Sequence, residues 1–220
     1  MVEIQKDVFW KAAVITLIVF SLGVLLGYLL EENRISEIQN EYKQVEMEWA
    51  DAKLQSVYYY QLLNPEYCDI AIESNINFAD KVYQQGLKLE RYEKANKLNN
   101  EMVYEKQRYA LLKLEFWMNS VILKDKCKAD YNNVVYFYKD QSSIAENSAQ
   151  EAQSKILLEL KNKYAQKVML IPLPIDMDIA TINIIKDIYN IEKVPTIFIN
   201  EKIKLENVNS LQEIEKNINL

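Results

Sequence analysis

The chain has 220 residues with 26 basic and 32 acidic side chains, giving a formal net charge of -6. These charges are spread evenly along the chain, so no basic surface is left for nucleic acid. The sequence holds no histidine, two cysteines and three glycines, which excludes a four-ligand zinc site and a glycine-rich phosphate-binding loop, and we expect no metal and no cofactor.

The first predicted element is a membrane-spanning helix. The run from Ala12 to Leu30 carries no charge, and its length of about 28 Å matches the hydrocarbon thickness of a bilayer. Lysines precede this run and glutamates follow it, so the positive-inside rule predicts a cytoplasmic tail at residues 1–11 and an extracytoplasmic location for everything after residue 30. No Ala-x-Ala cleavage site follows the run, which favours an uncleaved signal anchor in membrane lipid over a signal peptide.

Residues 31–63 are predicted to form a membrane-proximal, coiled-coil-like helix. Its apolar residues recur at alternating steps of three and four: Ile35, Ile38, Tyr42, Val45, Trp49, Ala52, Ser56, Tyr59 and Leu63. This seam either pairs two copies as a parallel homodimer or packs against later helices of the same chain.

A second pattern bears on the homodimer. Gly23 and Gly27 form a GxxxG pattern, which permits two membrane helices to approach closely but also occurs as ordinary spacing in such helices. The seam lies about 70° round the helix from the glycines. The two patterns do not share a face, which favours packing within one chain.

Residues 64–130 are predicted to form an antiparallel helical hairpin. Asn64 is expected to cap a helix that starts at Pro65 and runs to about Arg91. After a polar break, a third helix should cover about residues 101–126. The expected apolar stripes are Tyr67, Ile70, Ala71, Ser74, Phe78 and Val82 in the first helix, and Met102, Tyr109, Leu112, Phe116, Met118 and Ile122 in the second.

The two cysteines belong to this hairpin. Cys68 is in the first turn of one helix and Cys127 is at the last turn of the next, so antiparallel packing brings both to the same end. We therefore predict a Cys68–Cys127 disulfide that pins the hairpin, and such a bond persists outside the cytoplasm. A working redox pair is the alternative, although nothing in the sequence supplies the exposed, low-pKa thiolate that such chemistry needs.

From residue 131 the pattern alternates short apolar strands with helices. Strands are predicted at 134–138, 168–171, 196–200 and 203–205, with a tight turn at Glu201-Lys202. Helices are predicted at 145–164, at 179–189 and from Ser210, where Ser-Leu-Gln-Glu forms a capping box. The order β-α-β-α-β-β-α combines a parallel unit with an antiparallel hairpin and a closing helix.

This order, together with Val194-Pro195-Thr196 leading into an apolar strand, makes residues 131–220 resemble an α/β thioredoxin-like domain. The layout of anchor, all-α stalk with two cysteines and C-terminal domain is similar to membrane-anchored thioredoxin-like proteins of small-genome archaea. The resemblance implies a cis bond before Pro195 and a peptide groove beside it, with Val194, Pro195 and Thr196 as binding residues.

The resemblance also implies a dithiol at the start of the domain's first helix. Counting back from Tyr164 places its two positions at Asn147 and Gln150, and neither residue carries sulfur. No cysteine lies between residues 128 and 220. Since thiol-disulfide exchange requires a thiolate, we predict a domain without enzymatic activity that binds a protein partner or an extended peptide.

Two other functions fit the sequence. In one, the chain is an envelope thiol-disulfide oxidoreductase, in which Cys68 and Cys127 cycle or an active paralogue supplies the dithiol. In the other, it is a structural coiled-coil tether whose C-terminal domain does no chemistry.

Overall fold

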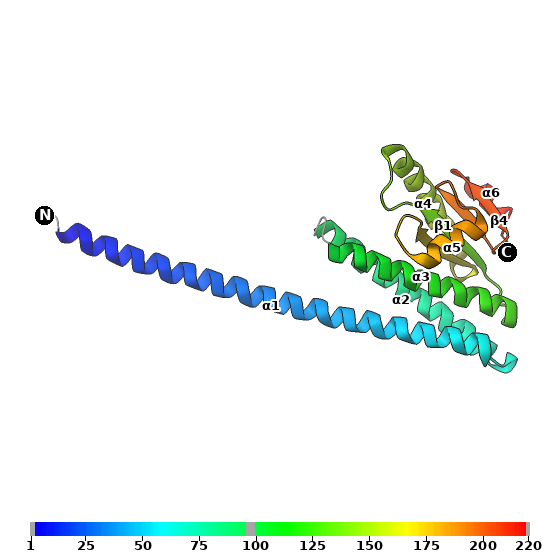
Figure 1. Cartoon of the computed structure of the whole chain (residues 1–220), viewed down its shortest axis with the longest axis horizontal. Coiled ribbons are helices and arrows are strands. Elements are labelled where there is room, and N and C mark those ends of the chain that lie inside the picture. The colour runs from blue at the N-terminus through cyan, green and yellow to red at the C-terminus, as the bar shows by residue number, and fades with distance from the viewer. Residues whose placement is uncertain (1–2, 96–99, 219–220) are drawn as a thin grey trace. The chain divides into compact units, whose positions relative to one another are not determined.

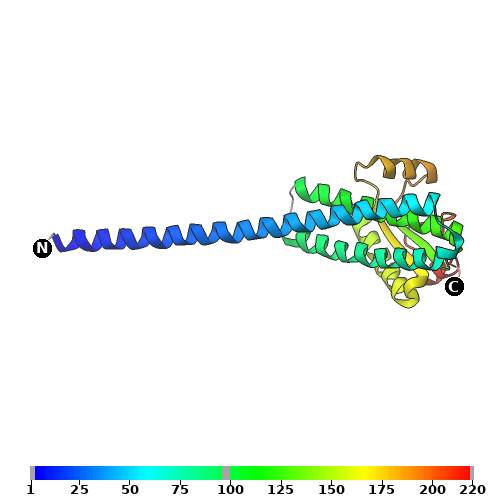
Figure 2. The same cartoon turned by 90° about the horizontal axis from the view of Figure 1, so that it is seen from below.

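The computed structural model describes the backbone of residues 3–95 and 100–218. The chain divides into two units, Met1–Ala50 and Asp51–Leu220. Helices dominate the described part, and a small mixed sheet lies in the C-terminal third of the sequence (Figure 1; Figure 2).

The first unit is most of helix α1 (Glu3–Gln61). Within α1, Val8–Leu29 is a run of 22 residues that is long and apolar enough to cross a membrane. Its large apolar side chains, including Phe9, Val19 and Leu25, are exposed. The sequence therefore correctly predicted one N-terminal apolar helix of spanning length, a property that signal sequences share.

In the second unit, the end of the predicted seam packs inside its own chain. Ala52 is fully buried, and Tyr59 packs against Ala71 and Leu123. Ser56 and Leu63 are half-buried. Packing within one chain is thus confirmed for these four positions, whereas the side chains of Ile35, Ile38, Tyr42, Val45 and Trp49 lie outside the described residues.

The predicted hairpin is present as α2 (Cys68–Ala95) and α3 (Asn100–Cys127). The start of its first helix differs from the prediction. Asn64 is extended, but its side chain makes no capping bond, and a 3₁₀ turn, η1 (Pro65–Tyr67), precedes α2. In this tighter turn the Tyr67 N–H donates to the Asn64 carbonyl over 3.0 Å, which satisfies the backbone without the side chain.

The predicted disulfide is confirmed. Cys68 and Cys127 are bonded, with their Cα atoms 5.4 Å apart. Both half-buried cysteines sit at the end of the hairpin next to the Tyr59 cluster. The bond therefore ties the start of α2 to the end of α3 through a loop of 59 residues.

The predicted apolar stripes were only partly right. Tyr67, Ile70 and Met118 are exposed, whereas α3 buries residues all round its circumference. One side of α3 packs on α2, and the other side packs on the sheet. A one-sided stripe therefore omitted these buried residues of α3: Ala110, Lys113, Leu114, Trp117, Asn119, Ser120 and Leu123.

The C-terminal elements follow the predicted order. They are β1 (Asn132–Tyr138), α4 (Ile144–Tyr164), a short 3₁₀ turn η2 (Ala165–Lys167), β2 (Val168–Pro174), α5 (Ala180–Tyr189), β3 (Thr196–Ile199), β4 (Ile203–Glu206) and α6 (Leu211–Glu215). The sheet order is β2-β1-β3-β4. β1 pairs parallel with β2 and antiparallel with β3, and β3 pairs antiparallel with β4.

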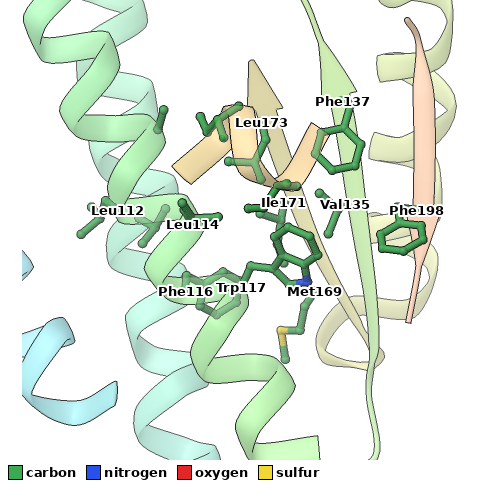
Figure 3. Close-up of a cluster of buried hydrophobic side chains, with 14 of the residues drawn as sticks. Leu112, Leu114, Phe116, Trp117, Val135, Phe137, Met169, Ile171, Leu173 and Phe198 are labelled. Atoms are coloured by element: carbon green, nitrogen blue, oxygen red, sulfur yellow. The ribbon is translucent and has the colours of Figure 1, made fainter. Parts of the chain in front are cut away.

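Helices cover both faces of the sheet, because side chains alternate along each strand. On one face, Val134 and Ile197 pack with Leu157 of α4 and Ile214 of α6. On the other face, strand residues meet α3 and α5. Figure 3 shows Trp117 of α3 pointing at this face, where its ring lies edge-on to Phe137 and Phe198 at centroid distances of 6.2 and 6.4 Å.

The turn between β3 and β4 lies one residue earlier than predicted. Asn200 and Glu201 both have positive φ, at 49° and 57°, and the Lys202 N–H donates to the Ile199 carbonyl over 3.1 Å. This is a type I′ turn, which usually contains glycine. Asparagine tolerates this conformation, which explains why Asn200 rather than Lys202 is a central residue.

Candidate functional site

The predicted binding residues lie where β1 and β3 meet at one end of the sheet. Phe137 pairs with Thr196, so Pro195 continues the register beside Tyr138. The Val194–Pro195 bond is cis. Pro195 and Thr196 are buried, and Val194 is half-buried against the core. We call Lys139, Asn147, Gln150, Val194, Pro195 and Thr196 the sheet-end site.

The backbone at Val194 has free hydrogen-bonding capacity. Within the described part of the chain, neither its N–H nor its C=O is hydrogen-bonded. The neighbouring Lys193 carbonyl is engaged, because the Thr196 hydroxyl donates to it over 2.7 Å. Thr196 thus fixes the loop, while Val194 keeps its own N–H donor and C=O acceptor for another chain.

The start of α4 is fixed at the same end of the sheet. Ser143 and Glu146 form a capping box, and the Lys139 ammonium pairs with Glu146 over 2.7 Å. The hydrogen bond from Lys139, together with those from Ser143, lowers the pKa of Glu146 to about 2. Glu146 is therefore an anion at neutral pH that anchors the loop between β1 and α4.

The two expected dithiol positions behave differently. Asn147 is exposed at the end of the first turn of α4, and its side chain donates to Glu151 over 3.1 Å. Gln150 is buried in the second turn and makes two bonds to Lys139, accepting from its N–H over 2.7 Å and donating to its C=O over 3.2 Å. Gln150 therefore ties α4 to the end of β1, next to Tyr138.

A second glutamine completes this attachment. Gln153 is fully buried, accepts from the Asn209 N–H over 2.6 Å and donates to the Asn209 C=O over 3.3 Å. Asn209 follows β4, whose Glu206 pairs with Thr196. Gln150 and Gln153 together attach α4 to the segments that follow β1 and β4, the two strands that pair with β3. Ile144, at the start of this helix, is 90% exposed.

A buried lysine next to the site was missed by the sequence reasoning. Lys113 of α3 is only 3% exposed, and its ammonium lies 4.4 Å from the Tyr109 ring and 5.7 Å from the Tyr138 ring. Burial lowers the pKa of Lys113 to about 7, against an opposing effect of Asp140. The only sequence signal was its place in an otherwise apolar run, Ala110 to Leu114.

The cysteines lie at the far end of the hairpin from the break between α2 and α3, and the only two in the chain are bonded to each other. Neither is therefore a thiolate. In the described ranges no group of three or more carboxylate, cysteine or histidine side chains could hold a metal ion. The chemistry available at the sheet-end site is hydrogen bonding and apolar contact.

Comparison of the chain with protein-family models and with curated proteins gives no match.

Proposed function

We propose that this chain is a single-pass membrane protein that displays a thioredoxin-like domain without a dithiol, and that this domain binds extended segments of protein partners. The support for the fold assignment is the strand order β2-β1-β3-β4 with helices on both faces and a proline loop before β3. The binding function rests on one observation, which is that the N–H and C=O of Val194, beside Pro195, have no hydrogen-bond partner among the described residues.

An extended chain would bind here by strand addition. Its backbone would accept from the Val194 N–H and donate to the Val194 C=O, which supplies affinity without a sequence requirement. Exposed apolar side chains at this end of the domain, Ile144 and Val208, would contact alternate side chains of the bound segment.

The support for an extracytoplasmic domain is the charge pattern around the span and the disulfide. The uncharged run Ala12–Leu30 is preceded by Lys6 and Lys11 and followed by Glu31 and Glu32. A structural disulfide persists in oxidising compartments and is rare in the cytosol. The cytoplasmic tail would then be residues 1–11.

Nuclear magnetic resonance of the full chain in phosphatidylcholine nanodiscs tests the binding function. The chain is labelled with ¹⁵N-valine and titrated with a permanently unfolded, carboxymethylated protein. We expect the Val194 amide signal to shift downfield and its hydrogen exchange to slow, because it gains an acceptor. Val168, buried at the opposite end of the sheet with its N–H already bonded to the Ala165 carbonyl, serves as the internal control and should not change. An unchanged Val194 signal at a saturating concentration of the unfolded protein would rule out this site.

An insulin-reduction assay separates this proposal from the oxidoreductase alternative. We expect that neither the full chain nor its Cys68→Ser variant reduces insulin in a thiol-dependent reaction. Turnover that depended on Cys68 would replace the binding function with disulfide exchange by the Cys68–Cys127 pair.

A further inference from the structure

An apolar groove lies at the opposite end of β3 from Pro195. It has a volume of about 520 Å³ and is formed by the end of α1, by α3, by α5 and by Glu201 in the β3–β4 turn. Val57, Tyr60 and Met118 contribute to its walls and are 47%, 68% and 40% exposed. Exposed apolar side chains gathered in one concave surface are typical of interaction sites.

The inner wall of the groove is rigid. Trp117 is buried, with its ring packed edge-on against Phe137 and Phe198 (Figure 3). Its indole N–H donates to Glu201 Oε1 over 2.7 Å. Tyr189, on the wall formed by α5, packs on Phe198 at a centroid distance of 4.6 Å. The groove is therefore formed before any partner arrives.

Among the described residues, Glu201 is the only charged one that lines this groove. Its Oε1 accepts from both Trp117 and Asn133, while Oε2 has no hydrogen bond and the carboxylate no ion pair with any described residue. The nearby Lys124 ammonium bonds to Asn200 instead. Lys124 still acts on Glu201 electrostatically, but no ion pair among the described residues neutralises the carboxylate, which lies within apolar walls.

The aromatic side chains of the groove also favour a cationic ligand. Tyr60, Trp117 and Tyr189 line the same groove as Glu201. Aromatic faces attract cations, as the Lys126 ammonium 5.5 Å from the Tyr60 ring centroid shows, and a carboxylate forms charge-assisted hydrogen bonds with ammonium groups. Charge complementarity therefore selects a cationic side chain, and the apolar walls select apolar neighbours for it.

We propose that this groove binds a segment of another protein in which one lysine or arginine is flanked by apolar side chains. The cation pairs with Glu201, and its neighbours pack on Val57, Tyr60 and Met118. This surface is separate from the sheet-end site, because the two lie at opposite ends of β3. Binding at the groove and binding at the sheet-end site can therefore be tested independently.

Matched peptides test the proposal on the full chain in phosphatidylcholine nanodiscs. The probe is a short capped peptide of leucine and serine with one central lysine. Two controls replace that lysine by norleucine or glutamate. Binding is read from 5-fluorotryptophan resonances, where the Trp117 signal reports the groove and Trp10 and Trp49 serve as references. We expect the lysine peptide to bind about tenfold or more tightly than the glutamate peptide.

Two substitutions identify the contacts. Glu201→Gln keeps an oxygen that accepts from Trp117 but removes the charge, so it should weaken the lysine peptide about tenfold and leave the norleucine peptide unchanged. Met118→Ser should weaken both peptides, whereas Ile70→Ser, at an exposed position on α2 outside the groove, should weaken neither.

Three results would overturn the proposal. They are equal affinity for the lysine and glutamate peptides, equal loss for the lysine and norleucine peptides in Glu201→Gln, or a shift of the Trp10 signal without one of Trp117, which would show attraction to lipid alone. If Glu201→Gln does not fold, the three peptides on the unmodified chain still decide the outcome.

Discussion

The Lys113 ammonium lies between two tyrosine rings in a place that water does not reach. Tyr109 and Tyr138 face it directly, and Asp140, the carboxylate that acts on it electrostatically, is already paired with Lys106 over 2.9 Å. Cation–π contact offsets only part of the cost of removing a lysine charge from water. The folded chain therefore holds the Lys113 proton less tightly than an unfolded chain does.

This burial predicts a pH-dependent stability. Lys113 has a pKa of about 7 when folded and 10.5 in its ordinary state, so between these values the unfolded chain binds a proton that the folded chain does not. Stability should therefore rise with pH above about 7, by at most about 1.4 kcal/mol per pH unit. Denaturant unfolding at pH 7 to 9.5 measures this slope.

Lys113→Met should remove that slope and raise stability at pH 7, because no charge is then buried. Lys155→Met, at an exposed position on α4, serves as the matched control and should keep the slope. An unchanged slope in Lys113→Met would assign the pH dependence to other groups.

Substitutions of Gln150 and Asn147 provide a second prediction for individual residues. Gln150→Ala leaves the half-buried N–H and C=O of Lys139 without their side-chain partner, which should cost about 1–3 kcal/mol of unfolding free energy. Asn147→Ala removes only a surface contact and should stay within about 0.5 kcal/mol. Chemical denaturation of both variants checks this. Equal losses would mean that Gln150 does not attach α4 to β1.

Among the elements, the helical hairpin depends on its covalent bond. The Cys68–Cys127 loop of 59 residues should contribute about 2–4 kcal/mol, chiefly by restricting the unfolded chain. The double variant Cys68→Ala with Cys127→Ala should lose this amount in denaturant unfolding. A reducing agent should destabilise the natural chain to the same extent and leave the variant unaffected. If the reducing agent also destabilised the double variant, its effect would not come from breaking the Cys68–Cys127 disulfide.

Element order could be read from the sequence because apolar strands and helices alternate after residue 131, and turn residues separate them. The burial of α3 could not, because contact with α2 on one side and with the sheet on the other erases a single stripe. Lys113, Asn119 and Ser120 are buried there despite their polarity. The disulfide was predictable because helix ends fix where Cys68 and Cys127 lie.

The sheet-end site was predictable in part. Val194-Pro195-Thr196 marks its loop, but the roles of Gln150, Gln153 and Lys113 depend on contacts between segments far apart in sequence. Glu201 gave no signal, since a glutamate in a turn normally reads as a solvated charge. Its partners Trp117 and Asn133 come from α3 and β1.

For the whole molecule, the proposed membrane orientation predicts a protease result. Right-side-out sealed vesicles treated with protease should lose residues beyond the span, because the domain is outside, while an epitope added before residue 1 should be protected. Vesicles opened by detergent control for protease activity. Protection of the C-terminal domain in sealed vesicles would reverse the orientation.

The bonding of both cysteines to each other leaves the oxidised chain without a single reactive sulfhydryl. The oxidised chain consequently does not react with maleimides, and no native cysteine has to be replaced before labelling. One added cysteine at any surface position would carry a dye or spin label alone. Distances between chosen positions, within one copy or across two, then become measurable in intact bilayers on an otherwise unaltered chain.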